Sequence, residues 1–246
     1  MSLSYPLRLL LTVLAYLIAR ILANWLAWAL RHPRPGRPGQ VVEFVRCWSR
    51  RLGLGELLRL GYYLLVPFVV LRLGWASPLD LGLADLDWVR GVGTTVVLCL
   101  AAILLLGCTW REFVRLADEA PPMDDLRWVS DAWGWTWLLR EAVLLEASWS
   151  LIRAPLLLIA GPYWGVYAAL GLVLSVSLFD PRTRSHLDTA GLREDVLLTG
   201  SVAIVTATLY ALAHNVWLCA AAHVAVRGAV LWLVRGLRPS PSGSLT

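Results

Sequence analysis

The sequence predicts an all-α protein built as a polytopic transmembrane helical bundle of about seven spans. Of its 246 residues, 58% are hydrophobic and only 16% are charged. Its apolar runs are also long: residues 91–110 and 154–179 contain no charged side chain. Because a helix needs roughly 20 apolar residues to cross the hydrocarbon core, these runs are typical of membrane spans. We therefore expect residues 1–246 to form a single integral membrane domain whose first partner is the lipid bilayer.

The hydropathy pattern divides the chain into seven candidate spans. The first contains Arg20, and the second contains Arg59 and Arg72 near its ends. A long arginine side chain at such a position can reach the headgroups while its stem stays in the apolar layer. The expected spans are 7–30, 57–75, 91–110, 130–152, 155–178, 196–213 and 217–234.

The arginine distribution predicts the orientation of these spans. Loop 31–55 is rich in arginine and includes the basic, proline-rich stretch 31–40, whereas loop 76–90 carries mainly aspartates. Every second loop repeats the arginine excess, which by the positive-inside rule marks the cytoplasmic side. We expect a plasma-membrane protein with its N-terminus outside, its C-terminus cytoplasmic and a flexible tail at 239–246.

The composition argues against several other classes of partner. The net charge of +5 fits the anionic cytoplasmic leaflet, and the chain has no recognised nucleic-acid motif. No glycine-rich phosphate-binding motif is present, so we expect no nucleotide. The four cysteines form no C-x-x-C pair, which argues against a zinc knuckle.

The most informative polar groups lie in the fourth span. Glu146, Trp149, Ser150 and Arg153 are spaced i, i+3, i+4 and i+7, so a helix places the carboxylate and the guanidinium on one face. Ionised groups at membrane depth are costly and often mark a site. Two interpretations stay open: a structural ion pair, or a general base or metal ligand. Glu141 is the lesser candidate, paired with a basic group elsewhere or nearer the interface.

The last two spans meet at a short turn that holds a second group of polar residues. Asn215 suits the N-cap of the final helix, which places His214 at the membrane surface. His223 follows about two turns later, with Arg227 at i+4 on the same face. A neutral imidazole at this position could carry a proton or bind a metal, or it could make an interhelical hydrogen bond.

A glutamate and an arginine on one membrane helix, followed by the final-helix sequence N-V-W-L-C-A-A-A-H, resemble the CPBP family of intramembrane proteases. That family includes the CAAX prenyl proteases and the bacteriocin-related Abi proteins. Its members carry an E-E-x-x-x-R helix, an F-x-x-x-H helix and a final helix with H-x-x-x-N. The resemblance covers a family-like core at 77–234.

Here Glu146 and Arg153 stand for the first motif, seven residues apart, and His223 for the last, with Arg227 at the position of the asparagine. For the middle motif, the only match is in the residue pattern of Tyr210 followed four residues later by His214.

The resemblance implies a hydrolase that cleaves a membrane-associated or lipid-modified peptide with water activated by Glu146. His223 would act as a metal ligand or acid/base partner, and Arg153 would orient Glu146. A metalloprotease would hold a divalent metal such as zinc on Glu146 and His223, although a catalytic zinc usually takes three protein ligands. The alternatives are a noncatalytic scaffold or pseudoprotease of the same fold that binds a membrane partner, and, more weakly, a transporter with helices broken at 153–155 and 161–162.

Overall fold

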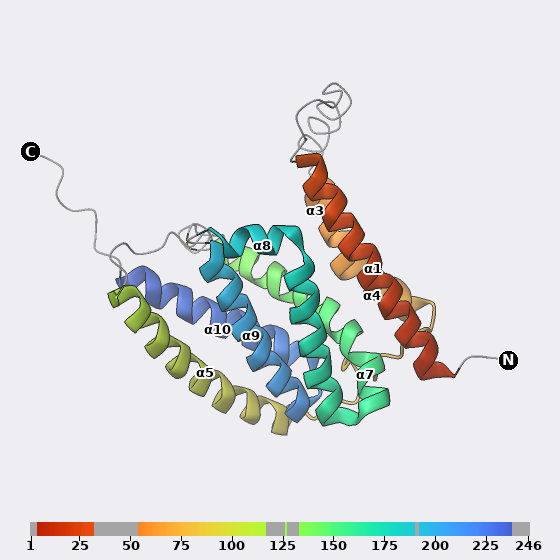
Figure 1. Ribbon diagram of the computed structural model, residues 1–246. Coiled ribbons are helices and arrows are strands. Elements are labelled where there is room, and N and C mark those ends of the chain that lie inside the picture. Colours follow the sequence, from red (N-terminus) through yellow and green to blue (C-terminus); the bar gives the residue numbers. More distant parts are fainter. Residues whose placement is uncertain (1–3, 32–53, 117–125, 127–132, 190–191, 238–246) are drawn as a thin grey trace, which may run out of the picture. The chain divides into compact units, whose positions relative to one another are not determined.

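The computed structural model describes residues 4–31, 54–116, 126, 133–189 and 192–237 (Figure 1). All the regular structure in these residues is helical, which confirms the predicted all-α class. Five of the described helices are long and apolar enough to cross a membrane, as an integral membrane protein requires. They are α1 (Tyr5–Arg31), α5 (Trp88–Leu116), α7 (Gly134–Phe179), α9 (Leu192–Ala213) and α10 (Val216–Leu237).

Four shorter elements complete the described helices. The first three, α3 (Leu54–Leu60), the π-helical turn η1 (Gly61–Leu65) and α4 (Val66–Arg72), follow one another without a break. The fourth, α8 (Pro181–Leu187), comes directly after α7. Apart from Arg31, the predicted basic loop 31–40 lies outside the described residues, and so does the tail 239–246.

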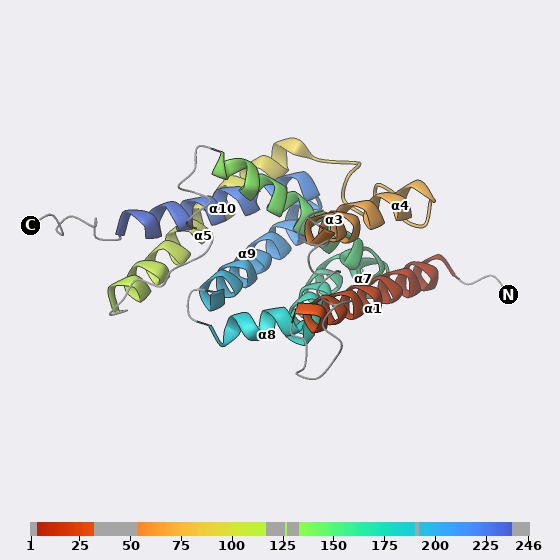
Figure 2. The ribbon, with the colours of Figure 1, turned by 90° about the horizontal axis from the view of Figure 1, so that it is seen from above.

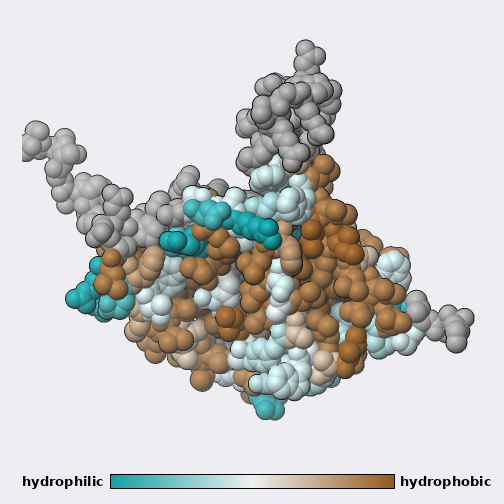
Figure 3. Space-filling view, in the orientation of Figure 1, coloured by the Kyte–Doolittle hydropathy of each residue, from teal (hydrophilic) through white to brown (hydrophobic). Residues whose placement is uncertain are grey.

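Helix α1 separates its side chains into two faces. Leu9, Val13 and Tyr16 are buried on one face. The opposite face carries an exposed apolar stripe that recurs every three or four residues. Figure 3 shows this stripe as a brown surface along α1. Such a stripe is stable in lipid rather than in water, which agrees with a membrane span. Its residues are Leu7, Leu11, Leu14, Ile18, Leu22 and Trp25.

The helices form two compact units, and the division between them falls within α7. Unit 1 takes residues 1–85 and 144–185, and unit 2 takes 86–143 and 186–246. The expected single-domain organisation and the family-like core at 77–234 stay predictions.

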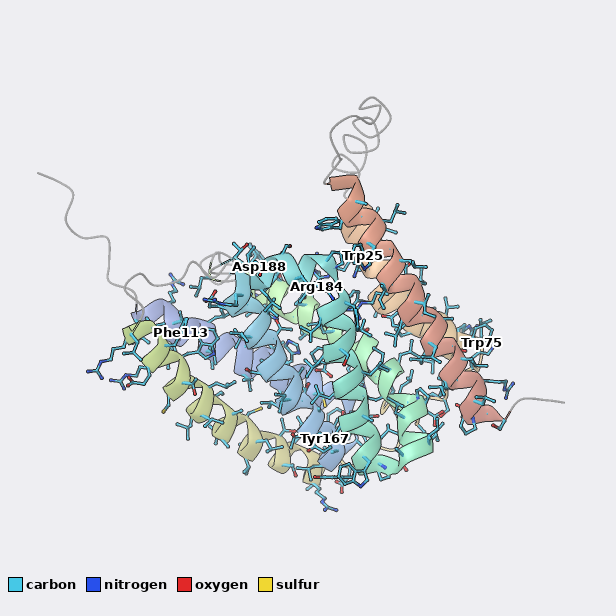
Figure 4. All side chains as sticks on the ribbon, in the orientation of Figure 1. Trp25, Trp75, Phe113, Tyr167, Arg184 and Asp188 are labelled. Atoms are coloured by element: carbon cyan, nitrogen blue, oxygen red, sulfur yellow. The ribbon has the colours of Figure 1, made fainter. Side chains whose placement is uncertain are left out.

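In unit 1, hydrogen bonds tie α1 to distant segments. Tyr16 Oη and Ser148 Oγ lie 2.8 Å apart, and Asn24 Nδ2 donates to Asp180 Oδ2 at 2.7 Å. Tyr5 donates its hydroxyl to Asp80, which also accepts from the Ser77 amide at 2.9 Å. Trp25 and Trp75 lie near opposite ends of α1 (Figure 4), as expected for aromatic side chains at the two edges of a bilayer.

In unit 2, α10 packs against both α5 and α9, and α5 and α9 also touch each other. Close contact between α5 and α10 depends on Gly91, because a Cβ there would lie 2.7 Å from Leu218 Cδ1. The beginning of α7 joins the same unit through Leu138, whose Cδ1 would be 3.7 Å from a Cβ on Gly228 of α10. These small residues allow the helices to approach, as is usual in membrane bundles.

Helix α7 contains a reversal that the sequence interpretation placed elsewhere. The expected boundary between the fourth and fifth spans lay at 153–154, but the helix continues through Pro155 and breaks at Gly161, where φ is +81° and ψ is 169°. A Cβ on Gly165 would lie 2.5 Å from the Leu156 carbonyl oxygen, although these residues would be about 13 Å apart along a straight helix. The chain therefore doubles back, as Figure 1 shows.

The physical reason for the corrected position is the conformation at the break. Glycine adopts this backbone region readily, whereas other residues avoid it. Pro162 follows directly and suits the first turn of a new helix, where its missing N–H is not needed. Residue 153 therefore lies about two turns inside the first arm of α7 instead of at a helix end.

Candidate functional site

The first arm of α7, residues 134–160, carries the predicted ion pair in its middle. Arg153 Nη1 donates to Glu146 Oε2 at 3.2 Å, and the two side chains are only 4% and 1% exposed. The guanidinium also lies 5.9 Å from the ring centroid of Trp149. The expected common face of Glu146 and Arg153 is thus confirmed.

The seven-residue spacing explains why the arginine must reach backwards. Glu146 and Arg153 are about 10 Å apart along the helix axis. Because side chains tilt toward the N-terminus of a helix, the long arginine can span this gap while Glu146 stays in place. The pair is electrically balanced in a buried environment, where an uncompensated charge would be costly. Removal of either partner should therefore disturb the middle of α7.

A second group of buried polar residues lies within unit 2, where α7 meets α10. The guanidinium of Arg227 lies 5.7 Å from the ring centroid of Trp137, close to the contact between Leu138 and Gly228. Figures 1 and 2 both show the beginning of α7 running antiparallel to α10. Glu141 follows Trp137 by one turn, and His223 precedes Arg227 by one turn, each on the same face of its helix.

Because the two helices are antiparallel, one turn forward from Trp137 on α7 and one turn back from Arg227 on α10 lead in the same direction. Glu141 and His223 therefore lie on the facing sides of their helices, one turn beyond the contact of Trp137 with Arg227. Both side chains are buried, and Arg227 is buried beside them. We call Trp137, Glu141, His223 and Arg227 the α7–α10 cluster.

The structure therefore divides the predicted site residues between two places. It brings Glu146 and Arg153 together in unit 1, whereas His223 belongs to unit 2. The expected approach of His223 to Glu146 stays a prediction. Of the buried acids that the structure describes, Glu141 and Glu194 share unit 2 with His223, and Glu141 is the lesser candidate of the sequence interpretation. The signal available in the sequence was its i+4 spacing from Trp137.

A catalytic zinc ion held by Glu146 and His223 would need more ligands than these two side chains supply. Catalytic zinc usually takes three protein ligands. Within the described part of the chain, no group of three or more His, Cys, Asp and Glu side chains is placed to hold a metal ion. Zinc bound by Glu146 and His223 stays a prediction, and the chemistry proposed below uses side chains alone.

The turn between α9 and α10 forms as the sequence predicted. Asn215 Oδ1 accepts from the amides of Trp217 at 2.9 Å and Leu218 at 3.2 Å, which confirms the N-cap of α10. His214 adopts a left-handed conformation with φ of +47°, and its ring lies 5.6 Å from the ring of Tyr210 at a tilt of 47°. Burial lowers the pKa of His214 below its ordinary value, so the ring is neutral near pH 7.

Comparison of the chain with protein-family models, with curated proteins and with solved structures finds no match. The resemblance to intramembrane proteases thus rests on the residues quoted for it, and the site must be argued from its own geometry.

Several polar residues of unit 1 escaped the sequence interpretation. Tyr16 and Asn24 carry the contacts of α1 with Ser148 and Asp180. Arg20 lies between them on the same face, at i+4 from Tyr16. The sequence does contain this signal, because polar residues at i, i+4 and i+8 in an apolar helix mark a face that avoids lipid.

Proposed function

We propose that this chain is an intramembrane peptidase-like protein that cleaves a membrane-associated or lipid-modified peptide. The observation that supports this proposal is the buried α7–α10 cluster, which places a carboxylate and an imidazole on the facing sides of two helices. Intramembrane ionisable groups are expensive and usually functional. A carboxylate beside an imidazole is also a common arrangement for general acid–base catalysis.

We also propose seven crossings with the N-terminus outside and the C-terminus cytoplasmic, in the plasma membrane. The arms of α7 at 134–160 and 162–179 measure about 40 and 27 Å, comparable with a hydrocarbon core of about 30 Å. The continuous segment 54–72 measures about 28 Å. With α1, α5, α9 and α10 these supply seven membrane-length segments.

The proposed reaction is hydrolysis by activated water. Glu141 accepts a proton from a water molecule, whose oxygen attacks the peptide carbonyl carbon. Arg227 is placed to stabilise the negative charge that develops on the carbonyl oxygen. When the C–N bond breaks, the departing nitrogen takes a proton from the Glu141–His223 pair. One water is consumed, and one carboxylate and one amine are released.

Within this proposal, Glu146 and Arg153 form a positioning pair on the same helix. The guanidinium of Arg153 already binds Oε2 of Glu146 at 3.2 Å, which leaves this carboxylate less available to a water molecule. Glu146 as the base, with His223 as partner, is the competing assignment, and a divalent metal such as zinc belongs to it. The two assignments predict different effects of single substitutions.

The test measures cleavage by the purified protein in proteoliposomes. The probe is a quenched fluorogenic peptide with a farnesylated cysteine near its C-terminus, the substrate type that the family resemblance indicates. Removing a general base should lower the rate by about a hundredfold or more. We expect this loss for Glu141→Gln and His223→Gln. Glu112→Gln is the matched control, because Glu112 forms an exposed ion pair with Arg115 at 3.8 Å.

The outcome separates the assignments. A large loss in Glu146→Gln, with Glu141→Gln retaining activity and both proteins equally folded, would transfer the base to Glu146. If metal chelation abolishes cleavage and zinc restores it, the metal-dependent form is supported.

A noncatalytic scaffold or pseudoprotease that binds a membrane partner is the second candidate. The observation that favours it is the charge balance of Glu146 and Arg153 at 3.2 Å, which suits packing as well as chemistry. It predicts that the wild-type protein cleaves neither the farnesylated probe nor an unmodified transmembrane peptide. It further predicts that Glu141→Gln changes only stability.

A further inference from the structure

Two guanidinium groups of unit 1 share one tyrosine ring. Arg20 of α1 lies 4.6 Å from the ring centroid of Tyr63, and Arg59 of α3 lies 5.7 Å from the same centroid. Each contact is a favourable cation–π interaction. The two cations nevertheless repel each other, and this repulsion is stronger at a membrane surface than in bulk water. An anion that contacts both would remove this cost.

The π-helical turn η1 explains how the ring comes to lie between them. Tyr62 and Tyr63 are consecutive, yet both face α1: the rings of Tyr62 and Tyr16 are 6.5 Å apart, and Tyr63 contacts Arg20. A π-helical turn is wider than an α-helical turn and occurs often at functional sites. The cost of this irregular turn indicates that the position of the two rings matters.

The surroundings of the two arginines are apolar. Both side chains are partly exposed. Their neighbours in sequence are exposed leucines and isoleucine, with Ile18 58%, Leu22 63% and Leu58 54% exposed. Such a surface faces lipid, where a guanidinium is stable only if it reaches the headgroup layer. The anions available at that depth are lipid phosphates.

A carboxylate and a further arginine follow near this group. Asp180 accepts from Asn24, one turn beyond Arg20 on α1, and Arg184 follows one turn later on α8. Arg184 donates its Nε to the Leu178 carbonyl oxygen at 2.6 Å. The neighbouring arginine-rich loop places this region at the proposed cytoplasmic side, where anionic lipids concentrate.

We propose that Arg20, Arg59 and Tyr63 form a binding site for the phosphate of an anionic phospholipid at the cytoplasmic surface. The phosphate accepts hydrogen bonds from both guanidiniums, which suit phosphate oxygens well. Its acyl chains lie along the exposed apolar stripe of α1. The bound lipid fastens α1 to the α3–η1–α4 segment.

The experiment measures the thermal unfolding midpoint of the full chain in vesicles of phosphatidylcholine with increasing fractions of phosphatidylglycerol. We expect the midpoint of the wild-type protein to rise and then saturate. Arg20→Gln and Arg59→Gln should each weaken the apparent lipid affinity about fivefold. Arg59→Lys should keep part of the response because it keeps the charge. Arg115→Gln is the control, since this exposed arginine lies on α5.

Each other outcome counts against the proposal. Glutamine variants that respond to phosphatidylglycerol like the wild-type protein would overturn the site. An equal loss of lipid affinity in Arg115→Gln would mean that the lipid responds to the net charge of the protein and not to this site. If inorganic phosphate stabilises the protein in pure phosphatidylcholine as much as the anionic lipid does, the ligand is free phosphate. If Arg20→Gln does not fold, Arg59→Gln carries the test, because its side chain is partly exposed.

Discussion

The ion pair of Glu146 and Arg153 shows how one residue can decide the stability of a membrane helix. Both side chains are almost fully buried, so neutralising one removes an ion-pair partner from a charge in a place where buried charge is costly. We expect Glu146→Gln or Arg153→Gln alone to cost about 3–5 kcal/mol of unfolding free energy. The double variant should recover much of this loss. Denaturant unfolding in detergent micelles would measure all three.

The exposed pair of Glu112 and Arg115 provides the comparison for this double-mutant cycle. Its two side chains are 59% and 77% exposed, and exposed pairs contribute about 0–1 kcal/mol. A coupling energy for Glu146 and Arg153 as small as that of the exposed pair would contradict their placement as a buried pair.

Asp80 makes part of the stability of unit 1 depend on pH. Partial burial alone would raise the pKa of this carboxyl, but hydrogen bonds from Ser77 and Tyr5 outweigh burial and hold the pKa below its ordinary value. The folded state therefore binds its proton more weakly than the unfolded state. The stabilisation is complete above the ordinary pKa of about 4 and is lost as pH falls through the folded pKa.

We expect Asp80→Asn to lower the unfolding midpoint at neutral pH and to remove this part of the acid dependence. Scanning calorimetry at several pH values would measure both effects. Asp85→Asn in the same segment is the control. If the two variants lose the same stability at every pH, the Asp80 hydrogen bonds contribute nothing.

For single residues, the sequence predicted the features that depend on spacing within one helix. The common face of Glu146 and Arg153 follows from helical periodicity, and the cap at Asn215 follows from a short polar side chain before an apolar helix. The role proposed for Glu141 was harder to predict from the sequence. It depends on the register of α7 against α10, which Trp137 and Gly228 set through contacts distant in sequence.

Among the elements, α7 depends most on glycine. Gly161 holds a backbone conformation that other residues adopt only with strain, and Gly165 brings the two arms together. Strain of this kind costs about 1–3 kcal/mol. We expect Gly161→Ala to destabilise by about this amount. Gly165→Ala should cost at least as much, because its Cβ meets backbone atoms that cannot rotate away.

Gly171 is the matched control in the second arm of α7. A Cβ there has nothing within 4 Å, and alanine favours the helix by about 1 kcal/mol. Gly171→Ala should therefore be neutral or slightly stabilising in the same unfolding measurement. A Gly165→Ala protein that is as stable as Gly171→Ala would show that the arms do not touch at this point.

The position of the break in α7 shows why the ends of a helix are harder to predict than its helical, apolar character. The sequence offers Pro155 and the pair Gly161–Pro162 as breakpoints, and the predicted spans place the boundary at the first. Proline inside a membrane helix is tolerated where neighbouring groups satisfy the freed carbonyl. The positive φ at Gly161 reverses the chain, and this dihedral depends on the packing of Gly165 against Leu156.

For the whole molecule, the remaining question is which segments cross the bilayer. Composition and hydropathy predict an all-α membrane protein, and the five long apolar helices agree with that class. The proposed count of seven depends on two further segments. The 46-residue helix α7 must cross twice, and the 54–72 segment must cross despite Arg59 and its π-helical turn. Each of these requirements assigns particular turns to one side of the membrane.

Cysteine labelling of intact cells tests both requirements together. In a background without the four native cysteines, single cysteines at Ser77, Tyr163 and His214 should react with a membrane-impermeant maleimide added outside. Cysteines at Glu112 and Asp188 should react only after permeabilisation. If a cysteine at Ser4, ahead of α1, reacts while Ser77→Cys is protected, the 54–72 segment does not cross, because α1 alone then separates the two positions. If Tyr163→Cys reacts only after permeabilisation, as expected for Glu112→Cys and Asp188→Cys, neither arm of α7 crosses the membrane and the number of spans falls by two.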